Sequence, residues 1–169
     1  NAGVPGYTAY QGDVLLRIDD TGCEIWNGEQ LHTGDQFAIA QILGIDAAQV
    51  RINTLYAGGS FGRRANPKSD YVLEAVNIAR AVGENIPVKL VWTREDDTQA
   101  GWYRPAYLHR LRASVDSDGM PQAWHHRLVG QSIATGTSFE AFLVKDGVDH
   151  TSVEGAANLP YAIPNIPVE

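Results

Sequence analysis

The residues best suited to chemistry lie in the glycine loop, residues 56–64, which reads Tyr-Ala-Gly-Gly-Ser-Phe-Gly-Arg-Arg. Three glycines within five residues make a helix or the interior of a central strand costly. A strand-like run, residues 50–56, precedes the loop, and a helix-like run that begins near Ser69 follows it. Such a loop can aim several backbone N–H groups at one anion, and Arg63 and Arg64 favour phosphate or carboxylate groups. Two interpretations stay open: an anion-binding loop, or a wide turn followed by a solvated arginine pair.

The glycine loop departs from the common nucleotide-binding and nucleophile motifs. It lacks the Lys-[Ser/Thr] ending of a P-loop and the glycine spacing of the dinucleotide fingerprint. Ser60 stands between Gly59 and Phe61 and so does not fit a G-x-S-x-G elbow. We find no serine, cysteine or histidine arrangement typical of nucleophilic catalysis. Residue chemistry alone predicts an α+β domain that binds an anionic partner and carries no catalytic group.

The sequence offers no convincing metal site. The only cysteine, Cys23, excludes an internal disulfide and a thiolate zinc site. His125 and His126 are adjacent on a predicted strand, so their rings point to opposite faces and cannot chelate one ion. Three consecutive acids, residues 95–97, are interpreted as a solvated turn. The other histidines have no partner at ligand spacing: His32, His109 and His150. We therefore expect no metal bound through side chains.

Length and charge narrow the class of protein further. A chain of 169 residues predicts one domain, or one and a half, and 44% hydrophobic residues can fill a core. The net charge of -7 gives no support to nucleic-acid binding. No apolar run approaches the roughly 20 residues of a membrane span. Because the chain starts at Asn1 and ends on a proline-rich track, we interpret it as part of a longer polypeptide.

Strands and helices that could position the glycine loop are readable from turn and cap signals. Residues 14–18 and 23–26 are predicted strands, joined by a hairpin turn at residues 19–22. Thr33 and Gln36 form a predicted capping box at the start of a helix. The predicted apolar stripe and stop of that helix are Phe37, Ala40, Leu43 and Gly44. A second helix is predicted over residues 69–82, ended by Gly83.

The remainder of the chain is predicted to be mainly β. Residues 88–93 are a predicted strand, and residues 94–97 a charged turn. Residues 107–115 and 121–132 alternate as the two arms of a long hairpin, which turns at residues 116–119. We therefore predict an α+β fold: a mixed sheet with two helices packed on it, plus a long antiparallel hairpin.

Several segments taken together are more specific than any one of them. Residues 58–64 resemble the G-G-G-F-G-[RK] motif of the molybdenum hydroxylase large subunits. Residues 23–26, together with Gln30, resemble the E-V-W-x-x-x-Q segment of the same subunits. These subunits form the xanthine dehydrogenase and aldehyde oxidase family. Further matching segments are residues 70–75, 87–97, 103–106 and 155–165. They narrow the resemblance to the branch of the isoquinoline 1-oxidoreductase β subunit and the membrane-associated aldehyde dehydrogenase.

The resemblance implies a molybdopterin-binding region of a larger oxidoreductase subunit. The implied cofactor is molybdenum-molybdopterin, as such or in a dinucleotide form. The implied cofactor-binding residues are Gln30, Gly59, Ser60, Phe61, Gly62 and Arg63. The backbone of Phe61 and Gly62 and the side chain of Gln30 donate hydrogen bonds near an oxygen ligand of the metal, which fits electrostatic preorganisation. No residue of this chain is carried over as a catalytic acid or base, or as a metal ligand.

The implied activity is hydroxylation of an aldehyde or an N-heterocycle with oxygen from water. The general base belongs to the remainder of the large subunit, and iron–sulfur clusters in a partner subunit take the electrons. The chain alone is therefore expected to be inactive. The alternative is a non-catalytic anion-binding or scaffold domain of the same fold without cofactor. The compartment is not given by the sequence, although the branch favours a periplasmic or membrane-associated bacterial enzyme.

The sequence departs from the family pattern at one position in the glycine loop, at the position directly after it, and at the N-terminus of the chain. Ser60 replaces the third glycine of the motif, so we expect Ser60→Gly to be harmless or helpful. Ala65 stands where purine-oxidising members carry a glutamate, so purines are not expected as substrates. We expect residues 1–12 to be irregular, residues 13–150 to form the molybdopterin-binding domain, and residues 151–169 to be an extended proline-rich segment that leads to the remainder. Gln30 and Gly62 are expected to converge on one site walled by Phe61.

Overall fold

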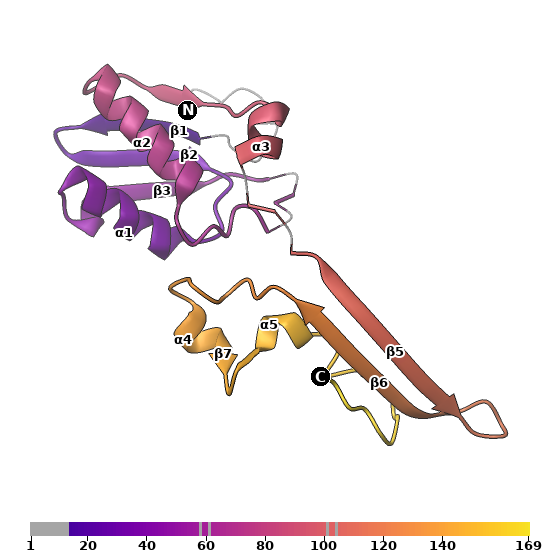
Figure 1. Cartoon of the computed structure of the whole chain (residues 1–169). Helices are drawn as coiled ribbons and strands as arrows, with labels where there is room; N and C mark the ends of the chain where they lie inside the picture. The colour runs from indigo at the N-terminus through magenta and orange to yellow at the C-terminus, as the bar shows by residue number, and fades with distance from the viewer. Residues whose placement is uncertain (1–13, 58, 61, 101, 104) are drawn as a thin grey trace. The chain divides into compact units, whose positions relative to one another are not determined.

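The computed structural model describes residues 14–57, 59–60, 62–100, 102–103 and 105–169 (Figure 1). The chain divides into two compact units, Asn1–Trp102 and Tyr103–Glu169. Residues 1–12, expected to be irregular, lie outside the described part. The expected domain boundaries at residues 13 and 150 stay a prediction.

The first unit is built on a four-stranded mixed sheet with the order β3-β2-β1-β4. Strands β1 (Val14–Asp19) and β2 (Gly22–Asn27) form the predicted antiparallel hairpin. Strand β3 (Val50–Thr54) pairs parallel with β2, whereas β4 (Val88–Leu90) pairs antiparallel with β1. At the hairpin turn the backbone N–H of Thr21 donates to the Asp19 carboxylate at 2.9 Å, as expected for an Asp-initiated turn.

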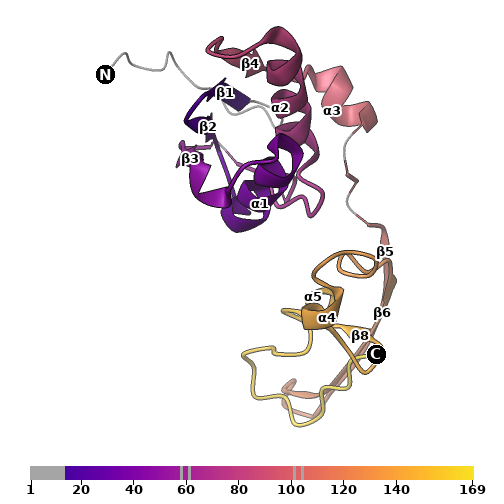
Figure 2. The same cartoon turned by 90° about the vertical axis from the view of Figure 1, so that its left-hand side faces the viewer.

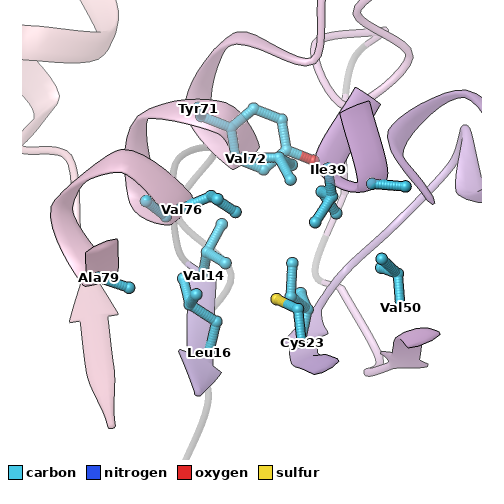
Figure 3. Close-up of a cluster of buried hydrophobic side chains, with 12 residues drawn as sticks. Val14, Leu16, Cys23, Ile39, Val50, Tyr71, Val72, Val76 and Ala79 are labelled. Carbon is cyan, nitrogen blue, oxygen red and sulfur yellow. The ribbon is translucent and has the colours of Figure 1, made fainter. Parts of the chain in front are cut away.

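Two helices, α1 (His32–Leu43) and α2 (Asp70–Val82), lie on one side of this sheet (Figure 2). The core forms between them and the sheet (Figure 3), because alternate residues of β1, such as Val14 and Leu16, are fully buried. Helix α2 contributes its stripe at helical spacing. The buried apolar residues are Val14, Leu16, Cys23, Ile25, Ile39, Ala40, Val50, Tyr71, Val72, Ala75, Val76 and Ala79. The predicted α+β class and the two packed helices are confirmed.

The predicted capping box of α1 is wrong. The N-cap is Leu31, without a side-chain hydrogen bond, and Thr33 lies inside the helix. The Gln36 amide instead donates to the carbonyl oxygens of Ala47 and Val50, at 3.0 and 2.9 Å. This side chain therefore ties α1 to the short 3₁₀ turn η1 (Ala47–Gln49) and the start of β3, and is not available for the cap.

The buried face of α1 also differs from the predicted stripe. Of the predicted stripe, Ala40 is buried as expected and Leu43 is half-buried, but Phe37 is 61% exposed. Ile39, which was not predicted, is fully buried. Asp35, one turn before Ile39, is buried on the same face of α1. The predicted helix stops are confirmed, since Gly44 caps α1 with a left-handed φ of 70° and Gly83 caps α2 with a φ of 119°.

The predicted charged turn after β4 is helix α3 (Arg94–Ala100). The Asp96 carboxylate accepts from the backbone N–H and the hydroxyl of Thr93, at 3.1 and 2.9 Å, and the Asp96 N–H donates to the Thr93 hydroxyl at 3.1 Å. This reciprocal pair is a capping box, and it makes three acids favourable in the first turn. The signal Thr-x-x-Asp was present in the sequence and was missed.

The second unit contains the predicted long hairpin, β5 (Tyr107–Val115) and β6 (Pro121–Gly130). Four short elements follow, namely α4 (Glu140–Leu143), β7 (Val144–Lys145), β8 (Val148–Asp149) and α5 (His150–Val153). The last residues run beside β6, with bridges from Asn165 to Ala123 and from Val168 to His126. Across the described ranges, we find no helix with both the length and the apolar character of a membrane span.

Candidate functional site at one edge of the mixed sheet

Two loops leave the same end of two adjacent parallel strands. Asn27, the last residue of β2, pairs with Thr54, the last residue of β3, so both chains leave the sheet at one edge. The glutamine loop, residues 28–31, follows β2, and the glycine loop follows β3. At this edge the Ser60 hydroxyl donates to Gln30 Oε1 at 2.6 Å. The fold therefore brings together two predicted site residues that are 30 positions apart.

The described part of the glycine loop depends on glycine backbone conformations. Gly59 has a φ of 140° and Gly62 a φ of 85°, values that side chains with a Cβ rarely adopt. The backbone N–H of Arg63 donates to the Ser60 carbonyl at 2.8 Å, which closes a turn around Gly62. A Cβ on Gly62 would meet no atom within 4 Å, so open space adjoins this exposed backbone. Phe61, the predicted wall of the site, lies outside the described residues.

The backbone of Gln30 is held by a buried carboxylate. Glu29 is buried, and its Oε1 accepts from the backbone N–H groups of Gln30 and Leu31, at 2.8 and 3.1 Å. Its Oε2 accepts from the Asn27 side-chain amide at 2.9 Å. Because these donors come from the end of β2 and the start of α1, Glu29 closes the glutamine loop onto itself and fixes where the Gln30 side chain starts.

Glu29 shares its buried environment with Asp35 of α1. Burial first, then the hydrogen bond and negative charge of Glu29, raise the pKa of Asp35 to about 8, although a hydrogen bond with Ser69 acts in the opposite direction. Burial alone would raise the pKa of Glu29, but hydrogen bonds with Asp35, Asn27 and the backbone N–H groups hold it below its usual value. At neutral pH the pair therefore carries one proton, on Asp35, and one negative charge, on Glu29.

The two arginines of the glycine loop are not a solvated pair, since Arg63 is 6% and Arg64 only 1% exposed. Arg63 forms a bidentate pair with Asp70 at 3.0 and 2.8 Å. Its guanidinium also lies 5.0 Å from the Trp92 ring centre and 3.7 Å from an Asp97 oxygen. These contacts fix the end of the loop against α2 and α3. A role of Arg63 toward a cofactor stays a prediction.

Gly28 is a site residue that sequence reasoning missed. A Cβ at this position would lie 2.9 Å from the Ala57 Cβ and 3.2 Å from Cζ and Nη1 of Arg64. Glycine is therefore required for the two loops to approach each other over the buried guanidinium. A glycine directly after a strand was a visible signal for this role. Asp35, an acid on the otherwise apolar face of its helix, was a visible signal for a buried polar contact.

The histidines make contacts that bear on the metal expectation. His109 and His126, on opposite arms of the hairpin, lie 2.9 Å apart, Nδ1 to Nε2, although the sequence gave His109 no partner. His125 contacts Glu169 instead, so the adjacent histidines do face different partners. Burial, followed by the charge of Asp19, raises the pKa of the Cys23 thiol to about 12. Within the described part of the chain, no group of three or more His, Cys, Asp or Glu residues could hold a metal ion.

The mixed sheet, with two helices packed on it and two loops meeting at one edge, defines an α+β domain. Residues 13–169 match the family of the molybdopterin cofactor-binding domain. The chain belongs to this family, and the resemblance predicted from the loop motifs is confirmed.

Individual relatives agree with this assignment. The chain is 35% identical over 123 residues to the isoquinoline 1-oxidoreductase subunit beta of Brevundimonas diminuta, covering 72% of this chain and 15% of that protein. It is 32% identical over 126 residues to the membrane-bound aldehyde dehydrogenase [pyrroloquinoline-quinone] of Gluconacetobacter polyoxogenes, covering 71% and 16%. The chain thus spans about a sixth of the length of these curated relatives.

A solved structure shares the fold. The crystal structure of quinoline 2-oxidoreductase from Pseudomonas putida 86 superposes with a TM-score of 0.53 at 18% identity, covering 69% of this chain and 15% of that chain. At this identity the likeness supports the fold alone.

Proposed function

We propose that this chain is the cofactor-contacting part of a molybdenum-dependent oxidoreductase subunit, and that the complete enzyme hydroxylates an aldehyde or an N-heterocycle with oxygen from water. The observation that carries the proposal is the hydrogen bond between Ser60 and Gln30, which joins the two family motifs at one sheet edge. The family assignment and the names of the two curated relatives support the reaction class.

The residues at this edge fit an anionic cofactor. Open space adjoins the Gly62 backbone, and the exposed amide of Gln30, on a backbone fixed by Glu29, contacts Ser60 in the same loop. The Glu29 carboxylate is buried and accepts three hydrogen bonds, so its negative charge is stabilised within the glutamine loop. We propose that Gln30, Gly59, Ser60, Phe61, Gly62 and Arg63 hold the cofactor, which supplies the two-electron redox chemistry when bound.

The contribution of this chain is to donate hydrogen bonds from a rigid frame. Glu29 fixes the Gln30 backbone, and the Arg63–Asp70 pair fixes the far end of the glycine loop. Donors held in this way need no reorganisation when charge develops on the cofactor. We further propose that the general base belongs to the remainder of the subunit and that an iron–sulfur subunit removes the electrons. A dinucleotide form of the cofactor is compatible with the open edge.

The alternative is a scaffold or anion-binding domain of the same fold without cofactor. The side chain at Ser60 favours it, because a hydroxyl occupies a loop position at which the family motif has glycine and the backbone is bare. The two functions differ in one measurable quantity, the molybdenum bound per subunit.

The test uses the full-length subunit, expressed together with its partner subunit in cells that make the cofactor. Molybdenum content and dye reduction with aldehydes and N-heterocycles are compared among the wild type, Gln30→Ala, Gly62→Val and Gly62→Asn. Asparagine tolerates a positive φ better than valine, so Gly62→Asn fills the open space with less backbone strain. Gln41→Ala, at an exposed position of α1, is the matched control.

Removal of the Gln30 amide takes away one donor to a charged group, worth about 1.5–3 kcal/mol, so the rate should fall ten-fold or more. Both Gly62 variants should lower molybdenum content, whereas Gln41→Ala should change neither quantity. Full molybdenum content and rate in Gly62→Val and Gly62→Asn would refute the site. A wild type that binds no molybdenum would establish the scaffold function instead.

A further inference from the structure

The Ser60–Gln30 contact constrains which end of the glutamine amide faces the open edge. The Ser60 hydroxyl donates to Gln30 Oε1 at 2.6 Å, at the short end of the range for O–H···O hydrogen bonds. A carboxamide has one oxygen that accepts and one NH₂ group that donates. Both lie in one plane and point in different directions from the same carbon. With the oxygen engaged by Ser60, the NH₂ group of Gln30 is directed away from the hydroxyl.

The remaining freedom of Gln30 is rotation of its side chain. Its backbone N–H is already held by Glu29 at 2.8 Å, and the neighbouring N–H of Leu31 at 3.1 Å. An exposed glutamine otherwise samples many rotamers, and restricting it to one costs side-chain entropy. A reversed amide would also present its oxygen, an acceptor, to an anion. The hydrogen bond that the Ser60 hydroxyl donates to Oε1 therefore restricts the rotation of the amide and holds its oxygen at the hydroxyl.

We propose that Ser60 is a positioning residue, which orients the Gln30 carboxamide so that its N–H group faces the anionic group of the molybdenum cofactor. This inference rests on the proposed function, because that function makes Gln30 a donor to the cofactor. It reverses the expectation drawn from the family motif, in which Ser60→Gly is harmless or helpful. Loss of one neutral hydrogen bond should reduce the rate about 2- to 12-fold.

The first experiment measures orientation without cofactor or activity. In the ¹⁵N-labelled 169-residue chain, the side-chain NH₂ signal of Gln30 is assigned by its loss in Gln30→Ala. Its ¹⁵N relaxation should report a restricted group in the wild type and a more mobile one in Ser60→Ala. Ser60→Thr keeps the hydroxyl and should keep the restriction, and Ser117→Ala, in the exposed hairpin turn, should change nothing. An equally mobile Gln30 amide in the wild type and Ser60→Ala would overturn the inference.

The second experiment separates positioning from a general structural role in the full-length holoenzyme. Ser60→Ala should lower kcat about 2- to 12-fold with little change in KM or molybdenum content, and Ser60→Thr should restore the rate. In a Gln30→Ala background, Ser60→Ala should have no further effect, because the group that it positions is gone. Independent, multiplicative losses in the double variant would overturn the inference.

The outcomes also distinguish this inference from the proposed function. Unchanged kcat and molybdenum content in Gln30→Ala would refute the role of Gln30 at the cofactor, and the inference with it. A slow Gln30→Ala enzyme combined with an unaltered Gln30 amide signal in Ser60→Ala would refute the positioning role alone.

Discussion

Replacement of Asp35 by asparagine tests the buried acid pair through the pH dependence of stability. The pKa of Asp35 is raised from an ordinary 3.8 to about 8 in the folded chain. Between these values the folded chain binds a proton that the unfolded chain has lost. The free energy of unfolding should therefore fall as pH rises, by at most about 1.4 kcal/mol per pH unit. The stabilisation from protonated Asp35 is fully present below about pH 4 and is lost as pH rises toward 8.

Asparagine has nearly the same shape, does not titrate, and can donate an N–H to Glu29 in place of the carboxyl proton. Asp35→Asn should therefore remove the slope, and between about pH 5 and pH 7 its stability relative to the wild type should rise by up to about 2.7 kcal/mol. Glu29 has a lowered pKa, so its contribution is lost only at pH values below its ordinary 4.5, outside this interval. The chosen range thus isolates Asp35.

The assay is urea unfolding of the chain at about pH 5, 6, 7 and 8, followed by fluorescence of its tryptophans. Asp20→Asn, at an exposed position of the first hairpin turn, controls for the loss of one negative charge. Parallel curves of unfolding free energy against pH for the wild type and Asp35→Asn would refute the proton-sharing argument.

Four further outcomes are expected. Gly28→Ala should destabilise the chain by more than 1 kcal/mol in urea unfolding, because its Cβ would lie 2.9 Å from the Ala57 Cβ. Gly34→Ala, in α1, should stabilise the chain by about 0.5–1 kcal/mol, because a Cβ there would meet no atom within 4 Å. Ile39→Ala should cost about 2–5 kcal/mol and Phe37→Ala much less, and equal costs would contradict the observed face of α1. The 169-residue chain alone should show no dye reduction with aldehydes or N-heterocycles, so turnover by the purified chain would disprove this expectation. Elemental analysis after dialysis against a chelator should find no stoichiometric metal bound through side chains, and a retained metal would count against that prediction.

Much of the secondary structure was predictable because its signals are local. The turn at residues 19–22 and the stops at Gly44 and Gly83 depend on backbone conformations that few residue types adopt, and these positions were identified correctly. The long hairpin was predictable for the same reason, since Asp116 accepts from the N–H groups of its own turn, at 3.0 Å from Asp118 and 2.9 Å from Met120. The family was predictable because several short motifs occur together in one order.

Apart from helix α3, whose local capping signal was missed, the errors concern residues whose environment is set by other elements of the fold. Periodicity placed Phe37 in the core and gave no place there to Asp35, since an isolated buried acid is costly. In the fold, Asp35 has a raised pKa and a hydrogen bond with Glu29 of the preceding loop, so its carboxyl group can occupy the buried face in the neutral form. A solvated Arg63–Arg64 pair was one of the two interpretations left open by the sequence, and the structure excludes it because both side chains are buried and Arg63 pairs with Asp70 of the following helix.

Residue order and type were enough to identify the two loops, their chemistry and the cofactor family they indicate. Their meeting was not determined by any local pattern. Gln30 and Ser60 become neighbours because β2 and β3 pair in parallel with their last residues in register. That register buries one face of the sheet beneath α1 and α2. In the sequence, Ser60 is only a departure from the glycine motif. Its hydrogen bond with Gln30 follows from the pairing of β2 with β3. Hydrogen bonds between separate loops depend on such long-range packing, and for that reason the three-dimensional arrangement decided which residues face each other at the site.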